Sequence, residues 1–225
     1  MDDPAIPAEM HAHALRALRR IHWISGTARS LWRRLRPIAT SLGRPARVLD
    51  LACGRGDLIE GLDRLARQAG CELQLAGCDV SAAALELARR HLDEAGVEAQ
   101  LVRLDLTADP LPRGHDVVVT SLFLHHLSDQ QIVSLFGRIA EAAGHLIASD
   151  LVRSRWGAAV TWVGTRTLTR CPVVHVDGMK SVRAALTPRE LHELAERAGL
   201  RGATVSRCWP ARQILQWSAD RGVPR

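Results

Sequence analysis

The sequence has no tyrosine, two phenylalanines and a single lysine, Lys180. Its formal net charge of +6 is therefore carried almost wholly by arginine. A basic surface can bind nucleic acid, an anionic membrane or an anionic ligand, and it can also reflect a genome rich in arginine codons. The many alanines and the lack of tyrosine fit the compositional explanation, so the charge alone points to no particular partner.

Long apolar runs and closely spaced cysteine pairs are also missing. No stretch of about 18 uncharged apolar residues occurs, so we expect no membrane-spanning helix. The acidic N-terminal segment lacks the residue order of a signal peptide. The five cysteines contain no C-x-x-C pair, which favours reduced thiols over a disulfide framework. We therefore expect a cytoplasmic protein, for which peripheral association with a membrane stays open.

Residues 8–42 are rich in arginine and carry apolar residues at helical spacing, which predicts one or two helices with a break at Gly26. Pro37 is expected to disturb the end of this segment. We treat residues 1–43 as an N-terminal helical extension. Three roles are open for it: a lid over a cofactor, a helix lying on an anionic lipid surface, or a solvated basic face.

Strands and helices alternate from residue 47 onward, and the segment 151–185 shows a less regular pattern. Ser81, Ser128 and Thr187 are expected to cap helices. The expected strands are 47–51, 72–78, 99–104, 116–121, 145–149, 203–209 and 212–217. This order predicts an α/β fold with a doubly wound, mostly parallel, Rossmann-like sheet of seven strands, which forms one domain over residues 44–225.

Ligands of such sheets bind beyond the carboxyl ends of the strands. The residues expected at those ends are Asp50, Asp79, Asp105, Ser121 and Asp150. Four of these five are acidic, a pattern that indicates a binding site rather than ordinary turn chemistry.

A glycine turn follows the first strand. Gly54 and Gly56 let the backbone approach a ligand closely. A dinucleotide-binding G-x-G-x-x-G motif would need a third glycine at Ile59, and the carboxylate of Asp50 would repel a pyrophosphate. Asp50 suits a ligand that carries an amino group or a sulfonium, which argues against a nicotinamide cofactor.

Two further carboxylates follow the next strands. Asp79 lies 23 residues beyond Gly56 and can accept hydrogen bonds from both ribose hydroxyls of a nucleoside. Asp105, followed by Leu106, can present a carboxylate to an adenine amino group beside an apolar wall.

Together these elements resemble the class I S-adenosylmethionine-dependent methyltransferases over residues 47–217. The family's glycine motif has an acidic residue and then small residues at alternate positions; here Ala52 replaces the first glycine. The resemblance implies S-adenosylmethionine as the cofactor. It places the methionine part at Asp50, Ala52, Cys53, Gly54 and Gly56, the ribose at Asp79 and Val80, the adenine at Asp105 and Leu106, and Ser121 at the end of the fourth strand nearby.

A histidine pair follows the fourth strand, in the segment S-L-F-L-H-H-L. Methyltransferases acting on nucleobase amino groups usually carry an Asn/Asp-Pro-Pro-aromatic motif there. This segment instead is similar to small-molecule methyltransferases with a His-His pair, including natural-product O-methyltransferases. An imidazole suits the removal of a hydroxyl proton. Our hypothesis is that His125 or His126, with Asp150, handles that proton, while at least one histidine packs structurally.

His175 is a second candidate base, in a polar segment after the fifth strand. In that segment Arg183 can hold an anionic substrate or pair with Asp177. No spaced set of His, Cys, Asp and Glu predicts a metal site. We expect a monomer or a homodimer.

The pattern favours methyl transfer to a small-molecule acceptor, with O-methylation of a phenolic or polyketide-like hydroxyl in a biosynthetic pathway as the leading hypothesis. Three alternatives stay open: methylation of carbon or nitrogen in a small molecule, methylation of nucleic acid, and cofactor binding without catalysis. A nucleic-acid enzyme predicts binding that depends steeply on salt, and the absent Pro-Pro motif counts against it, so we expect no nucleic-acid partner.

Overall fold

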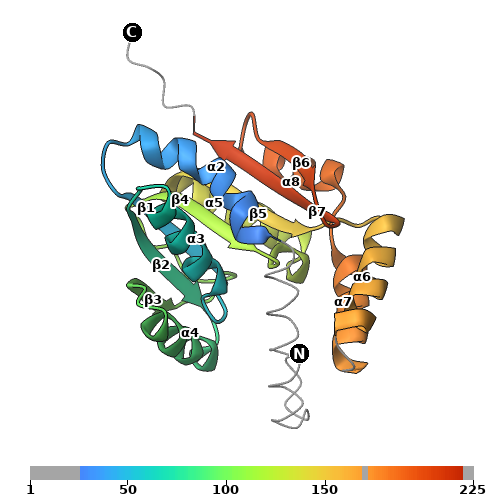
Figure 1. The fold of residues 1–225 in the computed structure, drawn as a ribbon. Helices are drawn as coiled ribbons and strands as arrows, with labels where there is room; N and C mark the ends of the chain where they lie inside the picture. Colours follow the sequence, from blue (N-terminus) through green and yellow to red (C-terminus); the bar gives the residue numbers. More distant parts are fainter. Residues whose placement is uncertain (1–25, 169–171, 220–225) are drawn as a thin grey trace.

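The computed structural model describes residues 26–168 and 172–219 (Figure 1). A seven-stranded sheet with the order β3-β2-β1-β4-β5-β7-β6 forms its centre. Only β7 runs antiparallel to its neighbours, β5 and β6, so the expected doubly wound, mostly parallel sheet is confirmed. The strands are β1 (Ala46–Leu51), β2 (Leu73–Asp79), β3 (Ala99–Arg103), β4 (His115–Ser121), β5 (Ala143–Leu151), β6 (Thr204–Cys208) and β7 (Arg212–Ser218).

Helices cover both faces of the sheet (Figure 1). Residues of α2, α3 and α4 pack in one hydrophobic cluster, and residues of α5 and α8 pack in the other. The helices are α2 (Thr27–Ser41), α3 (Asp57–Gln68), α4 (Ala82–Glu94), α5 (Asp129–Ala142), α6 (Arg155–Leu168), α7 (Pro172–Ala184) and α8 (Pro188–Arg197), with a short 3-10 helix, η1 (Leu124–His126).

Local sequence signals explain where several helices begin. Ser128 and Thr187 each form a capping box with the residue three positions on, and Ser81 accepts a hydrogen bond from the backbone of Ala84. These side chains satisfy backbone N–H groups that have no partner inside the helix. All three expected caps are therefore confirmed.

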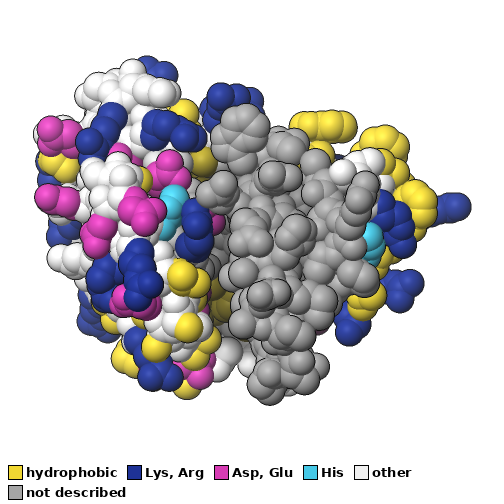
Figure 2. All heavy atoms as spheres, turned by 60° about the horizontal axis from the view of Figure 1, so that its bottom comes forward, with side chains coloured by type: hydrophobic (Ala, Val, Ile, Leu, Met, Phe, Trp, Pro, Cys, Tyr) yellow, Lys and Arg dark blue, Asp and Glu magenta, His cyan; other side chains and the backbone are white. Residues whose placement is uncertain are grey.

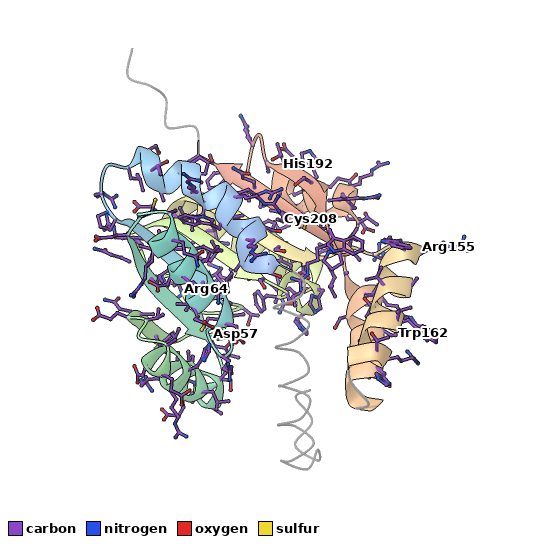
Figure 3. The ribbon with its side chains drawn as sticks, in the orientation of Figure 1. Asp57, Arg64, Arg155, Trp162, His192 and Cys208 are labelled. Carbon is purple, nitrogen blue, oxygen red and sulfur yellow. The ribbon has the colours of Figure 1, made fainter. Side chains whose placement is uncertain are left out.

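The expectation of irregular structure over 151–185 is wrong, because α6 and α7 form a helical hairpin there (Figure 1). Trp156 and Trp162 are exposed on α6 rather than packed on the sheet, and this obscures the usual amphipathic pattern. Figure 3 shows Arg155 and Trp162 on the side of α6 that points away from the sheet. In the space-filling view of Figure 2, hydrophobic side chains lie among basic ones at this edge of the molecule.

The described part of the expected N-terminal extension belongs to the core. Leu31, Trp32 and Leu35 of α2 are buried in the same cluster as Val48 of β1. Pro37 lies inside α2, which continues to Ser41. Residues 1–25 lie outside the described residues, so a lid role for them stays a prediction. Within the described ranges, no helix combines the length and the apolar character needed to cross a bilayer.

Candidate active site

Five parallel strands end at one edge of the sheet, and the residues expected there lie at that edge. Asp50, Asp79, Ser121 and Asp150 occupy the ends of β1, β2, β4 and β5, and Asp105 follows β3. Neighbouring strands are about 4.8 Å apart, so the strand order fixes the order of these side chains across the edge.

The glycine loop adopts positive φ at alternate residues. The φ angles of Ala52, Gly54 and Gly56 are 54°, 54° and 81°. Ala52 thus holds the left-handed conformation that its position requires even though it has a Cβ atom, at a cost of about 1 kcal/mol. No atom lies within 4 Å of the position that a Cβ atom would take on Gly54, which leaves open space beside the loop.

Asp50 is a buried carboxylate at this loop, with 3% of its surface exposed. Burial, and then the charge of Asp79, raises the pKa of Asp50 well above its ordinary value. Within the described part of the chain, no hydrogen-bond donor reaches this carboxylate. An ionised carboxylate in this position is unfavourable unless a cation pairs with it.

Asp79 organises the same loop. Its Oδ2 accepts a hydrogen bond from the backbone N–H of Gly54 at 2.9 Å, and its Oδ1 accepts one from Ser81 at 2.9 Å. Each carboxylate oxygen can accept a second bond, so both remain able to receive hydroxyl donors. The neighbouring Val80 exposes 57% of its surface, and its contact with a cofactor stays a prediction.

A short turn holds Asp105 beyond β3. Its Oδ1 accepts hydrogen bonds from the backbone and the hydroxyl of Thr107, and these bonds lower the pKa of Asp105. Arg138 of α5 donates to the backbone carbonyls of Leu106 and Asp109 and so fixes the turn. The side chain of Leu106 is buried in the core, so it does not form an exposed apolar wall; its contact with a cofactor stays a prediction.

Cys53 also points toward the core. A Cβ atom on Gly77 would lie 2.9 Å from the Cys53 sulfur, so this side chain fills space beneath the loop. Burial raises the pKa of Cys53, and it raises the pKa of Cys78 on the adjacent strand to about 12. Cys53 can therefore meet a ligand in the loop only through its backbone.

The fold brings His125 and Asp150 together. Nδ1 of His125 lies 2.7 Å from Oδ1 of Asp150, and the backbone N–H of His125 donates to Oδ2 at 3.0 Å. Their side chains are 5% and 4% exposed. His126 is exposed, and its ring centroid lies 4.1 Å from that of His125. His125 therefore has the contact with Asp150 that our hypothesis requires.

Two other predicted residues have different surroundings. Nε2 of His175 lies 3.1 Å from the backbone oxygen of Thr165, so this contact ties α7 to α6. Its role as a base stays a prediction, and the side chain of Asp177 lies outside the described residues.

Ser121 ends β4 in register with Ser149, and Leu122 follows it with a φ of 57°. A branched residue at positive φ indicates local backbone strain at the site edge, which the sequence did not reveal.

The fold also gathers Asp57, Glu60 and His91, whose possible ligand atoms lie within 4.8 Å of one another. The sequence did not predict this cluster because α3 and α4 contribute separate members. Arg55 lies 3.3 Å from Oδ1 of Asp57 and 3.2 Å from Nδ1 of His91. Arg64 also lies 3.7 Å from Oε1 of Glu60, so two guanidinium groups supply positive charge to the two carboxylates of the cluster.

These features define an α/β protein with acidic side chains at the carboxyl ends of its parallel strands, one of which, Asp50, is buried beside a glycine loop. A model described as a methyltransferase domain matches residues 48–144. A ubiquinone biosynthesis O-methyltransferase of Thiobacillus denitrificans is 31% identical over 185 residues, which cover 79% of this chain and 75% of that protein. The protein of the same name from Bordetella pertussis is 29% identical over 94% of this chain and 80% of its own length.

Solved structures share the fold. The plantazolicin methyltransferase BpumL with S-adenosylhomocysteine has a TM-score of 0.68 at 14% identity, over 96% of this chain and 91% of that one. Human N-acetylserotonin methyltransferase with S-adenosylmethionine has a TM-score of 0.64 at 17% identity, over 95% of this chain and 60% of that one. The chain spans 51% of the methyltransferase SibL, with a TM-score of 0.59, 20% identity and 79% of this chain covered. The chain belongs to the class I S-adenosylmethionine-dependent methyltransferases.

The residues present fit S-adenosylmethionine. The buried carboxylate of Asp50 lacks a described partner and suits the amino group of the methionine part. The position of a Cβ atom on Gly54 is open, so a ligand could approach the backbone there, and Asp79 retains acceptor capacity for ribose hydroxyls.

Proposed function

We propose that this enzyme methylates a hydroxyl oxygen of a small molecule, of a phenolic or polyketide-like kind, in a biosynthetic pathway. The observation that carries this proposal is the contact between His125 and Asp150 at the ligand edge of the sheet. The relatives named ubiquinone biosynthesis O-methyltransferases support transfer to oxygen. A hydroxyl acceptor must lose a proton, and a histidine oriented by a carboxylate can take it.

Strand order supports this assignment of roles. Asp50 lies at the end of β1, and β4 and β5 follow it across the sheet. An acceptor beside His125 would therefore lie next to the methionine part of the cofactor. Bound S-adenosylmethionine supplies a methyl group already activated by a sulfonium.

The protein residues then position the acceptor and move its proton. With Nδ1–H of His125 donating to Asp150, the tautomer leaves Nε2 free to accept the hydroxyl proton. Asp150 stabilises the imidazolium that forms and keeps the ring oriented through its second bond to the backbone N–H of His125. The burial of both side chains strengthens this electrostatic coupling by excluding water.

The test is a methyl-transfer assay on a panel of phenols and hydroxylated polyketides, with the methylated atom identified by NMR. His125→Ala should lower kcat by about 100-fold or more, while the affinity for S-adenosylhomocysteine stays unchanged. His126→Ala is the matched control, because it removes the neighbouring ring. Full turnover by His125→Ala, or methylation of carbon or nitrogen only, would contradict the proposal.

A further inference from the structure

Arg212, the first residue of β7, is a buried arginine to which the proposed reaction gives no role. Only 3% of its surface is exposed, and burial lowers its pKa to about 10. In the described part of the chain, its guanidinium forms no hydrogen bond or salt bridge, and Nη1 is fully buried without a partner. A buried charge with unused donors is costly unless a ligand or a counter-ion satisfies it.

The nearest carboxylate does not satisfy this guanidinium. Asp150 attracts Arg212 electrostatically, but no salt bridge within 4.0 Å joins them. The oxygens of Asp150 already accept bonds from His125 and from the backbone N–H of Leu151. Oδ1 of Asp150 thus accepts two bonds and Oδ2 accepts one, and none of them comes from Arg212, so the donors of Arg212 remain available.

A second unused polar group lies on the same face of the sheet. Ser149 of β5 is 1% exposed, and its hydroxyl has no hydrogen-bond partner among the described residues. It is paired in register with Ile214, which lies two residues from Arg212 and so points to the same face. A guanidinium and a hydroxyl thus share one face where the parallel strands end, and the fork of an arginine matches a carboxylate.

The surroundings of Arg212 are basic. Arg33 and Arg34 of α2 act electrostatically on Cys208, as Arg212 does. Cys208 ends β6 directly opposite Arg212 and is labelled in Figure 3. Arg34 also donates to Ser206 of β6 at 2.8 Å. This arrangement favours an anion over a neutral or cationic group.

Strand order decides whether the anion belongs to the cofactor or to the acceptor. The sequence of strands is β1-β4-β5-β7, so Arg212 lies three strand spacings, roughly 14 Å, from the methionine site at β1. The pair of His125 and Asp150 lies between them, at β4 and β5. Asp150 is paired in register with Gln213 and so points to the opposite face of the sheet from Arg212 and Ser149. An acceptor with its hydroxyl at His125 would therefore cross the end of β5 to reach Arg212.

We propose that Arg212, with Ser149, binds a carboxylate of the acceptor, so that the substrate is a hydroxylated carboxylic acid. The proposal rests on the proposed function because it takes the acceptor hydroxyl to lie at His125. Arg212 would thus select the substrate, and the group that it binds would carry a negative charge.

The test is calorimetry on the full chain saturated with S-adenosylhomocysteine, with benzoate and the neutral, isosteric benzamide as probes. The wild type should bind benzoate at least about tenfold more tightly than benzamide. Arg212→Gln should remove this difference and leave the affinity for S-adenosylhomocysteine within about twofold. Arg207→Gln, which removes an exposed arginine on β6, is the matched control and should keep the difference.

Three results would overturn the proposal: no preference for benzoate in the wild type, an unchanged preference in Arg212→Gln, or an equal loss of affinity for S-adenosylhomocysteine. The last result would assign the guanidinium to the cofactor's own carboxylate. If Arg212→Gln does not fold, as judged by circular dichroism, Arg212→Lys serves instead. Lysine keeps the positive charge but lacks the paired donors of the guanidinium. An undiminished preference for benzoate in Arg212→Lys would contradict recognition of the carboxylate by the guanidinium.

Turnover separates this inference from the proposed function. Equal kcat/KM values for 3,4-dihydroxybenzoate and 3,4-dihydroxybenzamide would leave O-methylation standing and refute the acid specificity. A benzoate preference that depends on Arg212, with no methyl transfer to any hydroxyl, would support the carboxylate site and refute O-methylation.

Discussion

Nδ1 of His125 lies 2.7 Å from Oδ1 of Asp150, and the backbone N–H of the same histidine donates to Oδ2 at 3.0 Å. One carboxylate thus fixes both the position of the residue and the tilt of its ring. The two groups come from η1 and β5, which are 25 residues apart in the sequence and meet because β4 and β5 are neighbours in the sheet.

Asp150→Asn should lower kcat by about 100-fold to 10,000-fold. An amide cannot stabilise an imidazolium as a carboxylate does, and it can hold the wrong tautomer. The measurement is steady-state kinetics with an accepted phenol, beside the affinity for S-adenosylhomocysteine, which should not change. A kcat within threefold of the wild type would show that Asp150 only supports the local fold.

The affinity for S-adenosylhomocysteine should rise with pH. Because its pKa is raised, Asp50 keeps its proton in the folded protein at a pH at which the unfolded chain has lost it. The free energy of unfolding therefore falls as the pH rises through the folded-state pKa of Asp50. The cationic amino group of the ligand favours the ionised carboxylate, lowers this pKa and releases a proton on binding. Calorimetry in buffers of different ionisation enthalpy, over about pH 5 to 8, measures the released protons.

Asp50→Asn should abolish this proton release and weaken binding at the upper end of the range. The same release in the variant would assign the proton to another group, with Asp79 as the nearest carboxylate that acts on Asp50.

Gly54→Ala should weaken the binding of S-adenosylhomocysteine at least about tenfold, because the new methyl group would stand in the open space beside the loop. Its positive φ also costs about 1 kcal/mol of stability. Gly70→Ala is a close control: Gly70 has a φ of 67° and no atom within 4 Å of its Cβ position, and it follows α3 away from the loop. Equal affinities of the two variants would contradict a cofactor at Gly54.

Cys53 and Cys78 should resist alkylation in the folded protein. Burial raises the pKa of each thiol, and for Cys78 the value reaches about 12, so little thiolate exists near neutral pH. Iodoacetamide at about pH 8 should label the partly exposed Cys71 at least tenfold faster, as followed by peptide mass spectrometry. Urea-unfolded protein supplies the reference, in which all sites react; labelling of Cys78 as fast as Cys71 in the folded state would refute the burial argument.

The sequence alone determined the sheet and the contents of its ligand edge. Strand ends such as Asp50 and Asp79 follow apolar runs, and Ser128 and Thr187 mark helix starts, because these signals are local and depend on side-chain periodicity and backbone capping. The same locality allowed the glycine motif to be recognised even though Ala52 replaces a glycine.

Tertiary structure decided what these residues face. The sequence treated His125 and His126 alike, and only the pairing of β4 with β5 gave His125 its carboxylate. It missed α6 and α7, because Trp156 and Trp162 are exposed on a hairpin rather than packed against the sheet. Arg212 looked like any strand residue. Its burial, with Nη1 lacking a hydrogen-bond partner in the described part of the chain, depends on the antiparallel pairing of β7 with β5, a long-range contact that no local pattern encodes.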